Sequence, residues 1–163
     1  MPDMLANLLI LPDLQPHLNA LSEQGVVIRR ANVFEISQVR SFIQNNFATS
    51  WADEVLVGFS NKPVTVYIAI RDGEVIGFGA YECTRRAYFG PTGVTERERG
   101  KGIGKALLLA CMHGLRDLGY VYGIIGGAGP IEFYSGALGA IVIPGSEPGI
   151  YADRLKRRTE PDD

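Results

Sequence analysis

The stretch that decides the fold runs Arg99-Gly100-Lys101-Gly102-Ile103-Gly104-Lys105-Ala106. Its glycines remove side chains where a backbone must bend tightly or approach a ligand closely. A helical apolar pattern begins directly after it, and the first turn of a helix leaves N–H groups without intrahelical partners. These N–H groups, the helix dipole and the basic side chains together favour anionic phosphate oxygens. We therefore predict a phosphate-binding turn at the start of a long helix.

Two familiar nucleotide motifs do not match this turn. A Walker A loop, GxxxxGK followed by Ser or Thr, would need glycine and a hydroxyl residue where the chain has Arg99 and Ala106. A dinucleotide fingerprint, GxGxxG, would need its last glycine where the chain has Lys105 or Leu107. The turn is therefore expected to hold a phosphate ligand of another kind.

Strand and helix patterns alternate on both sides of the turn. Before it, Asn32 with Glu35 three residues later forms a capping-box pattern that predicts a helix start. After it, a broad apolar face over residues 102–118 predicts a helix buried against a sheet. The expected strands cover residues 26–31, 64–71, 75–84, 88–94, 120–125, 140–143 and 149–152, and the other expected helices begin near Asn32, Trp51 and Ile131. This order predicts an α/β fold with a mixed, mostly antiparallel central sheet flanked by helices.

The two ends of the chain are predicted to lie outside this core. Residues 4–24 lack a basic n-region and a small-residue cleavage site, so we expect an amphipathic helical extension rather than a signal peptide. We therefore divide the chain into a helical extension over residues 1–25, one domain over residues 26–153 and a solvated tail over residues 154–163.

Composition excludes several classes of function. The 163 residues carry a formal net charge of −2, which argues against sequence-independent binding to nucleic acid, since that needs a basic surface. The apolar stretch near the N-terminus is far shorter than the roughly 20 residues that span a bilayer, so we expect no membrane anchor. Cys83 and Cys111 lack the spacing of a disulfide framework or a zinc site, so we expect no metal and a cytoplasmic setting.

Two segments of the sequence resemble the GCN5-related N-acetyltransferase (GNAT) superfamily. The pyrophosphate motif of that family, (Q/R)xxGx(G/A), is matched by residues 99–104 between a strand and a helix. Phe133-Tyr134, followed by Leu138-Gly139, is similar to the FYxxLGF segment that follows the fifth strand of the family. The resemblance spans residues 26–152 and implies a GNAT-like fold.

The resemblance implies acetyl-CoA as the acyl donor. In the family the sheet splays after its fourth strand, and the pantetheine arm of the donor bonds to the exposed backbone of that strand. Carried over to this sequence, the strand residues are Thr92, Gly93 and Val94. The backbone amides of residues 101–105 would hold the pyrophosphate.

The resemblance also implies how acetyl transfer is catalysed. Tyr134 matches the tyrosine that protonates the departing thiolate in many relatives, although a packed tyrosine that caps a helix or strand end is the alternative. Some relatives carry a glutamate on the fourth strand, at the position of Gly90, so that general base is missing here. Glu82 and Glu54 are the candidate substitutes, acting directly or through water, although a solvated surface charge is the favoured interpretation of each.

The first two helices of the family often border the acceptor pocket, and Trp51 and Asp53 fall there. An aromatic wall with carboxylates would suit a cationic or sugar amine. In the alternative, Ser50 and Asp53 cap a helix and Trp51 fills the core.

Together these features predict an acetyl-CoA-dependent N-acetyltransferase. It would transfer the acetyl group directly to a primary amine of a small molecule, such as an amino sugar, a polyamine or an amino-acid-like compound. Two alternatives stay open, namely a non-catalytic acyl-CoA-binding regulatory module and a protein or peptide N-acetyltransferase. Many relatives pair through terminal strands or helices, so a homodimer is expected by analogy.

Overall fold

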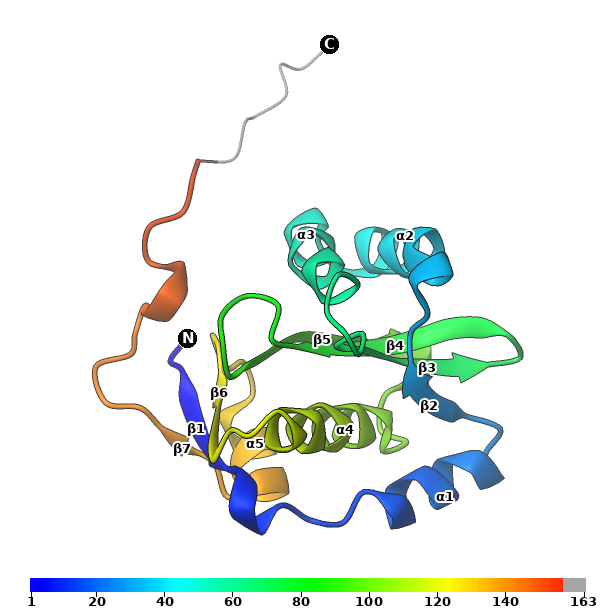
Figure 1. The fold of residues 1–163 in the computed structure, drawn as a ribbon, viewed down its shortest axis with the longest axis horizontal. Helices are drawn as coiled ribbons and strands as arrows, with labels where there is room; N and C mark the ends of the chain where they lie inside the picture. Colours follow the sequence, from blue (N-terminus) through cyan, green and yellow to red (C-terminus); the bar gives the residue numbers. More distant parts are fainter. Residues whose placement is uncertain (157–163) are drawn as a thin grey trace.

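One twisted sheet forms the centre of the fold (Figure 1). The computed structural model describes residues 1–156, and within them the strand order is β2-β3-β4-β5-β6-β1-β7. Neighbouring strands pair antiparallel except β5 and β6, which are parallel. The strands are β1 Met4–Asn7, β2 Val27–Arg30, β3 Val66–Arg71, β4 Glu74–Tyr81, β5 Tyr88–Val94, β6 Tyr122–Ile125 and β7 Ile141–Val142. The predicted mixed, mostly antiparallel α/β fold is confirmed.

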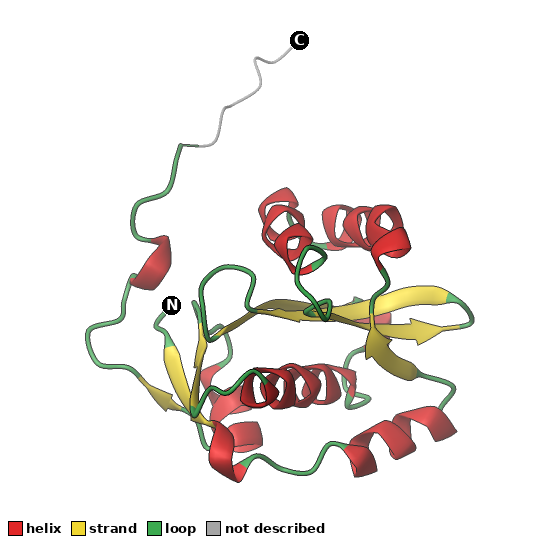
Figure 2. Ribbon diagram, in the orientation of Figure 1, coloured by secondary structure: helices red, strands yellow, loops and turns green. Residues whose placement is uncertain are grey.

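Helices cover both faces of the sheet (Figures 1 and 2). Helices α2 and α3 lie on one face, and α1 and α4 lie on the other. The α-helices are α1 Gln15–Glu23, α2 Ile36–Asn46, α3 Thr49–Gly58, α4 Ile103–Asp117 and α5 Ile131–Leu138. Short 3-10 helices are η1 Leu8–Ile10, η2 Val33–Glu35, η3 Glu96–Glu98 and η4 Gly149–Tyr151. No described helix is long and apolar enough to cross a membrane.

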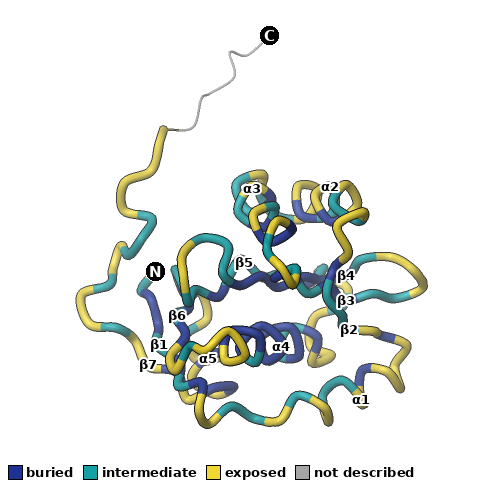
Figure 3. The backbone as a smooth tube through the Cα atoms, in the orientation of Figure 1, coloured by how far each residue is buried: buried dark blue, intermediate teal, exposed yellow. Residues whose placement is uncertain are grey.

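Local sequence signals explain most of the element boundaries. The capping box is present, since the Asn32 amide donates to Glu35 Oε1 at 2.6 Å before η2 and α2. Asp72 and Gly73 both take positive φ angles in the turn between β3 and β4, as a tight hairpin requires. Ten of the 15 residues of α4 are buried, as its broad apolar face predicts (Figure 3).

The sheet opens between its two parallel strands. Tyr88 pairs with Ile124 and Phe89 with Ile125, and the pairing of β5 with β6 ends there. In the same region Gly79 pairs with Thr92 while Tyr81 pairs with Phe89, so β5 carries one residue more than β4. Such a β-bulge bends a strand and interrupts its pairing. The rest of β5 therefore has an open edge on its β6 side.

The helical prediction for residues 4–24 is wrong at its beginning and correct at its end. Residues Met4–Asn7 form β1, which lies between β6 and β7, and only Gln15–Glu23 form a helix. Met4 and Ala6 are completely buried while their neighbours are half-buried. That alternation is typical of a strand, so the N-terminal segment completes the sheet instead of packing beside it.

The C-terminal segment differs from its predicted secondary structure. Residues 149–152 do not form a strand, because η4 occupies Gly149–Tyr151. It follows Pro148, which has no N–H for a sheet ladder, and Gly149 has a φ of 70°. The predicted tail, residues 154–163, lies outside the described residues from position 157 onward.

Candidate active site

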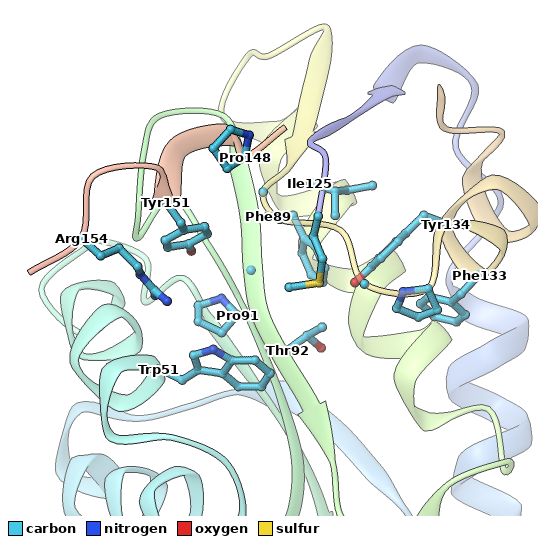
Figure 4. Close-up of a pocket in the computed structure, with 16 residues that line it drawn as sticks. Trp51, Phe89, Pro91, Thr92, Ile125, Phe133, Tyr134, Pro148, Tyr151 and Arg154 are labelled. Atoms are coloured by element: carbon cyan, nitrogen blue, oxygen red, sulfur yellow. The ribbon is translucent and has the colours of Figure 1, made fainter. Parts of the chain in front are cut away.

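A cavity of about 520 Å³ lies where β5 and β6 diverge. Its floor is the beginning of β5, and two groups of side chains face each other across it (Figure 4). We call these groups the Trp51 wall and the Tyr134 wall. The Trp51 wall comprises Trp51, Pro91, Tyr151 and Arg154, and the Tyr134 wall comprises Phe89, Ile125, Phe133 and Tyr134. The cavity thus joins segments that lie far apart in the sequence.

Tyr134 extends from the first turn of α5 toward β5, and its hydroxyl points into the cavity (Figure 4). Its ring packs edge-on against Phe89 and Phe133, with centroid distances of 6.3 and 5.1 Å. The residue is only 6% exposed, and this burial raises the pKa of Tyr134 to about 12. The phenol therefore stays protonated across the neutral and moderately alkaline range. The proton-donor role of Tyr134 and the alternative of a packed tyrosine both stay predictions.

The turn predicted to bind phosphate, residues 99–105, follows the far end of β5 and leads into α4; we keep the name phosphate-binding turn for this segment. Gly100 and Gly102 have φ angles of 78° and 88°, which favour glycine, and a Cβ at either position would meet open space. The first recorded helical hydrogen bond runs from the Ala106 amide to the Gly102 carbonyl, at 3.1 Å. The N–H groups before it therefore lack the partners that later helix residues have. This geometry suits an anionic group at the N-terminus of α4.

Two basic side chains of the turn are engaged within the protein. Arg99 Nε donates to the Val94 carbonyl at 3.1 Å, and Lys101 Nζ donates to Glu98 Oε2 at 3.0 Å. Hydrogen bonds from Arg71 and Lys101 lower the pKa of the Glu98 carboxyl to about 2. The backbone of the turn is thus free for a phosphate, while Lys101 would have to leave Glu98 to reach one.

The open edge of β5 does not offer its residues equally. Successive residues of a strand point their N–H and C=O groups to opposite sides. The Thr95 amide donates to the Ile76 carbonyl on β4, so Gly93 faces β4 as well, whereas Thr92 and Val94 face the open edge. A Cβ on Gly93 would lie 2.5 Å from the Phe47 ring. Gly93 is therefore explained by packing, and Thr92 and Val94 are the strand residues with outward backbone groups.

Glu54 and Tyr151 form a polar pair behind the Trp51 wall. The Tyr151 hydroxyl donates to Glu54 Oε2 at 3.0 Å, and Thr84 donates to the same oxygen. Burial and the neighbouring Glu54 charge raise the pKa of Tyr151 to about 12. Glu54 thus reaches the cavity through the Tyr151 hydroxyl, which makes it the better placed of the two candidate bases.

Two of the expected site residues lie away from this cavity. Glu82 Oε1 accepts from the Tyr120 hydroxyl at 2.6 Å and Glu82 Oε2 from the Ala87 amide at 2.8 Å, beside a separate cavity of about 260 Å³. Glu82 therefore holds the connection between β4 and β5. Asp53 is exposed on α3, and α3 begins at Thr49 without a side-chain cap. Of the two residues expected to bind the acceptor, Trp51 lines the cavity and Asp53 does not.

Sequence reasoning missed Tyr151 and Arg154, which line the cavity from the C-terminal segment. The Arg154 guanidinium lies 4.6 Å from the centroid of the Tyr151 ring. No motif marks either residue, because their position depends on how a loop after the last strand returns across the sheet. Among residues 1–156, no group of three or more His, Cys, Asp or Glu side chains could hold a metal ion.

Solved structures of similar fold include acetyltransferases from different organisms. The GCN5-related glucosamine N-acetyltransferase region of a fungal multi-domain GH3 β-N-acetylglucosaminidase has a TM-score of 0.66 and 18% identity, covering 87% of this chain and 19% of that chain. A GCN5-related N-acetyltransferase from Sphaerobacter thermophilus has a TM-score of 0.66 and 17% identity, and the match covers 87% of this chain and 48% of that chain. A Brucella melitensis GNAT family acetyltransferase in complex with acetyl-CoA has a TM-score of 0.54 and 21% identity, and the match covers 68% of this chain and 81% of that chain. The chain thus spans less than half of the length of the first two.

Sequence comparison assigns the family. No curated protein sequence matches the chain significantly. The acetyltransferase (GNAT) family profile matches residues 31–134, more than half of the chain, from the end of β2 to Tyr134. It includes the phosphate-binding turn and the whole of β5. The chain therefore belongs to the acetyltransferase (GNAT) family.

Proposed function

We propose that this protein is an acetyl-CoA-dependent N-acetyltransferase that transfers the acetyl group directly to a primary amine of a small molecule. The observation that carries the proposal is the position of the cavity. It lies against the open edge of β5 and has the Tyr134 hydroxyl on one side. The cavity is at the beginning of β5, and the phosphate-binding turn follows the end of the same strand. An extended thioester can therefore lie along one strand with its phosphates at one end and its acyl carbon at the other.

The donor would be held mainly by backbone groups. The amides of residues 101–105 would bind the pyrophosphate, helped by the positive end of α4 and the charge of Lys105. The outward backbone groups of Thr92 and the outward amide of Val94 would bond the pantetheine arm as an added strand does. Arg99 supports this arrangement indirectly, since it already bonds the Val94 carbonyl at the corner of the turn.

The amine acceptor would enter from the Trp51 wall and lose its proton there. Its N–H can donate to Tyr151 Oη while the Tyr151 hydroxyl proton passes to Glu54, so the pair works as one relay. The free amine then attacks the thioester carbon, and an outward amide of β5 stabilises the developing oxyanion. Tyr134 donates its hydroxyl proton toward the departing sulfur from the opposite wall. Protons thus leave on one side of the reacting carbon and arrive on the other.

The shape of the cavity and one similar structure bear on the class of acceptor. The cavity is bordered by the C-terminal segment as well as by the sheet, which favours a small acceptor over a long peptide. The fungal region is described as a glucosamine N-acetyltransferase, which keeps amino sugars among the candidate acceptors. A cytoplasmic setting and a homodimer stay predictions.

Calorimetric titration with acetyl-CoA tests the donor site, with S-acetylpantetheine, which lacks the phosphates, as the control. We expect micromolar affinity for acetyl-CoA and much weaker binding of the control. Release of free thiol with a panel of amino sugars, polyamines and amino acids then tests transfer. Binding without transfer to any amine would favour the regulatory module, and no binding at millimolar donor would refute both readings.

A further inference from the structure

Two residues that line the cavity carry a positive charge, and one of these charges, the α-ammonium of Met1, is already paired with Glu147 Oε1 at 2.6 Å. Arg154 is the only lining residue with a charged side chain, within the part of the chain that the structure describes. Most of the other lining side chains are aromatic or aliphatic, including Trp51, Phe89 and Ile125. A ligand that fills this cavity would therefore meet a mainly apolar surface with one cationic side chain, that of Arg154.

The guanidinium is held in place by the same network that anchors the Trp51 wall. It lies over the Tyr151 ring at 4.6 Å from the centroid, a distance at which a cation and an aromatic face attract each other. Tyr151 is in turn bonded to Glu54 on α3. No carboxylate of residues 1–156 forms an ion pair with Arg154. Among the described residues, the Arg154 donors thus have no carboxylate partner, and they lie beside the cavity on the side where the acceptor would enter (Figure 4).

This lining distinguishes between the classes of acceptor. A polyamine carries several cations and would need carboxylates, but none lines the cavity. Glu54 and Asp3 bond to lining residues and are already engaged, since Glu54 accepts from Thr84 and Tyr151, and Asp3 accepts from the Gly127 amide at 2.8 Å. An amino sugar would need several polar partners, but the Thr92 hydroxyl donates to the Phe78 carbonyl at 3.0 Å. A buried polar group without a partner costs binding energy, so both classes fit poorly.

We propose that the acceptor carries a carboxylate in addition to its amine and that Arg154 binds this carboxylate. This inference rests on the proposed acetyl transfer. A planar guanidinium matches a carboxylate with two parallel hydrogen bonds, and one guanidinium balances its single charge. The apolar body of such an amino acid would lie between Trp51 and Tyr151, with its amine next to the Tyr151–Glu54 relay. The substrate class is thus an amino acid with an apolar side chain.

Matched pairs of amines test the proposal. The twenty amino acids, spermidine and glucosamine are first ranked as acceptors, and the best amino acid is then compared with its decarboxylated amine. We expect the amino acid to be favoured at least about 10-fold in kcat/KM, since a hydrogen bond to a charged group typically has that effect or more. Arg154→Gln should remove this preference, whereas Arg154→Lys should retain part of it. Lys156→Gln, an exposed basic position two residues away, is the control and should leave the preference intact.

The outcomes separate this proposal from the one on which it rests. Loss of the carboxylate preference in Arg154→Gln, with unchanged acetyl-CoA affinity by calorimetry, supports it. A best acceptor that lacks a carboxylate, or an equal loss for both members of the pair, overturns the role of Arg154 and leaves acetyl transfer standing. Failure of every amine to accept the acetyl group would overturn both.

Discussion

The two ends of β5 carry the two proposed sites, and the chain forms them in opposite ways. The phosphate-binding turn is one unbroken segment, residues 99–105, whose properties come from local backbone geometry. The cavity at the other end draws its walls from α3, β5, α5 and the C-terminal segment. The first site depends on glycine conformation and a helix terminus, and the second depends on long-range packing. The donor site should therefore tolerate changes in distant segments, whereas the acceptor site should not.

The largest effect is expected from a charge placed in the turn. Gly104→Glu would put a carboxylate on the first turn of α4, where nothing in the fold blocks it, since Val94 Cγ2 lies 3.8 Å from a Cβ. Like-charge repulsion of several kcal/mol should weaken acetyl-CoA binding by about 1,000-fold. Calorimetric titration measures the change.

Gly136→Glu is the matched control for this experiment. Gly136 is also a helical glycine, it is exposed on α5, and a Cβ there meets nothing within 4 Å. It should leave the donor affinity unchanged. Similar losses in both variants would mean that the turn does not hold the phosphates.

The next largest effect should come from Tyr134→Phe. Removal of a positioned proton donor typically costs about 100-fold or more, so we expect kcat to fall by about 100-fold with little change in acetyl-CoA affinity. Tyr134 must be protonated to act, and its pKa is raised to about 12, so its contribution should be lost only as the pH rises through about 12. The profile of kcat against pH should therefore show no decline due to Tyr134 below pH 10. Stopped assays over the range from pH 6 to 10 test this.

Tyr120→Phe serves as the control, because its hydroxyl binds Glu82 beside the other cavity. It should leave kcat unaltered. If Tyr134→Phe retained full activity, Tyr134 would be a packing residue of the cavity and the general acid would have to be sought elsewhere.

Much of the fold could be predicted from local patterns. The strand Tyr88–Val94 has the predicted bounds, and the buried face of α4 and the turn at Asp72 and Gly73 follow from periodicity and turn chemistry. The errors lie at the two ends of the chain. Met4–Asn7 is too short for an alternation of buried and exposed residues to distinguish a strand from a helix, since its apolar residues suit both. It forms a strand because it pairs with β6, more than a hundred residues away in the sequence.

The site divides in the same way. The turn was predictable because its glycines, basic residues and helix start are contiguous. Tyr151 and Arg154 carry no local signal, since they acquire a role only when the C-terminal segment returns to α3. Gly93 was assigned to the donor strand by the resemblance, and its packing against the Phe47 ring could not be predicted, because a sequence does not show which distant side chain meets a glycine.

A smaller effect should come from the relay on the Trp51 wall. Tyr151→Phe and Glu54→Gln should each lower kcat/KM by about 10-fold, which is less than the roughly 100-fold or more typical of general acid–base groups, because water can replace part of a relay. Since the two side chains act as one unit, the double variant should lose little more than either single one. The double-mutant cycle is read from steady-state kinetics.

Glu82→Gln distinguishes the two candidate bases. It should lower thermal stability by loosening the β4–β5 connection, but it should leave kcat/KM unchanged. Fully additive losses in the Tyr151 and Glu54 variants would contradict the relay. A large loss of kcat/KM in Glu82→Gln would mean that Glu82 acts in catalysis.

The smallest effect on donor binding is expected at Gly93, which the resemblance assigns to the donor strand and which packs against Phe47. Its Cβ would lie 2.5 Å from the Phe47 ring, and that ring stacks on Trp51 at 5.5 Å. Gly93→Ala should therefore destabilise the fold by about 1–3 kcal/mol, as overpacking does, and shift Trp51 enough to raise the acceptor KM. The affinity for acetyl-CoA should stay within about twofold, since the substitution keeps the backbone of β5. Adding Phe47→Leu should recover thermal stability. A loss of donor affinity that Phe47→Leu did not relieve would mean that Gly93 makes room for pantetheine, and the donor site would then also depend on a packed interface.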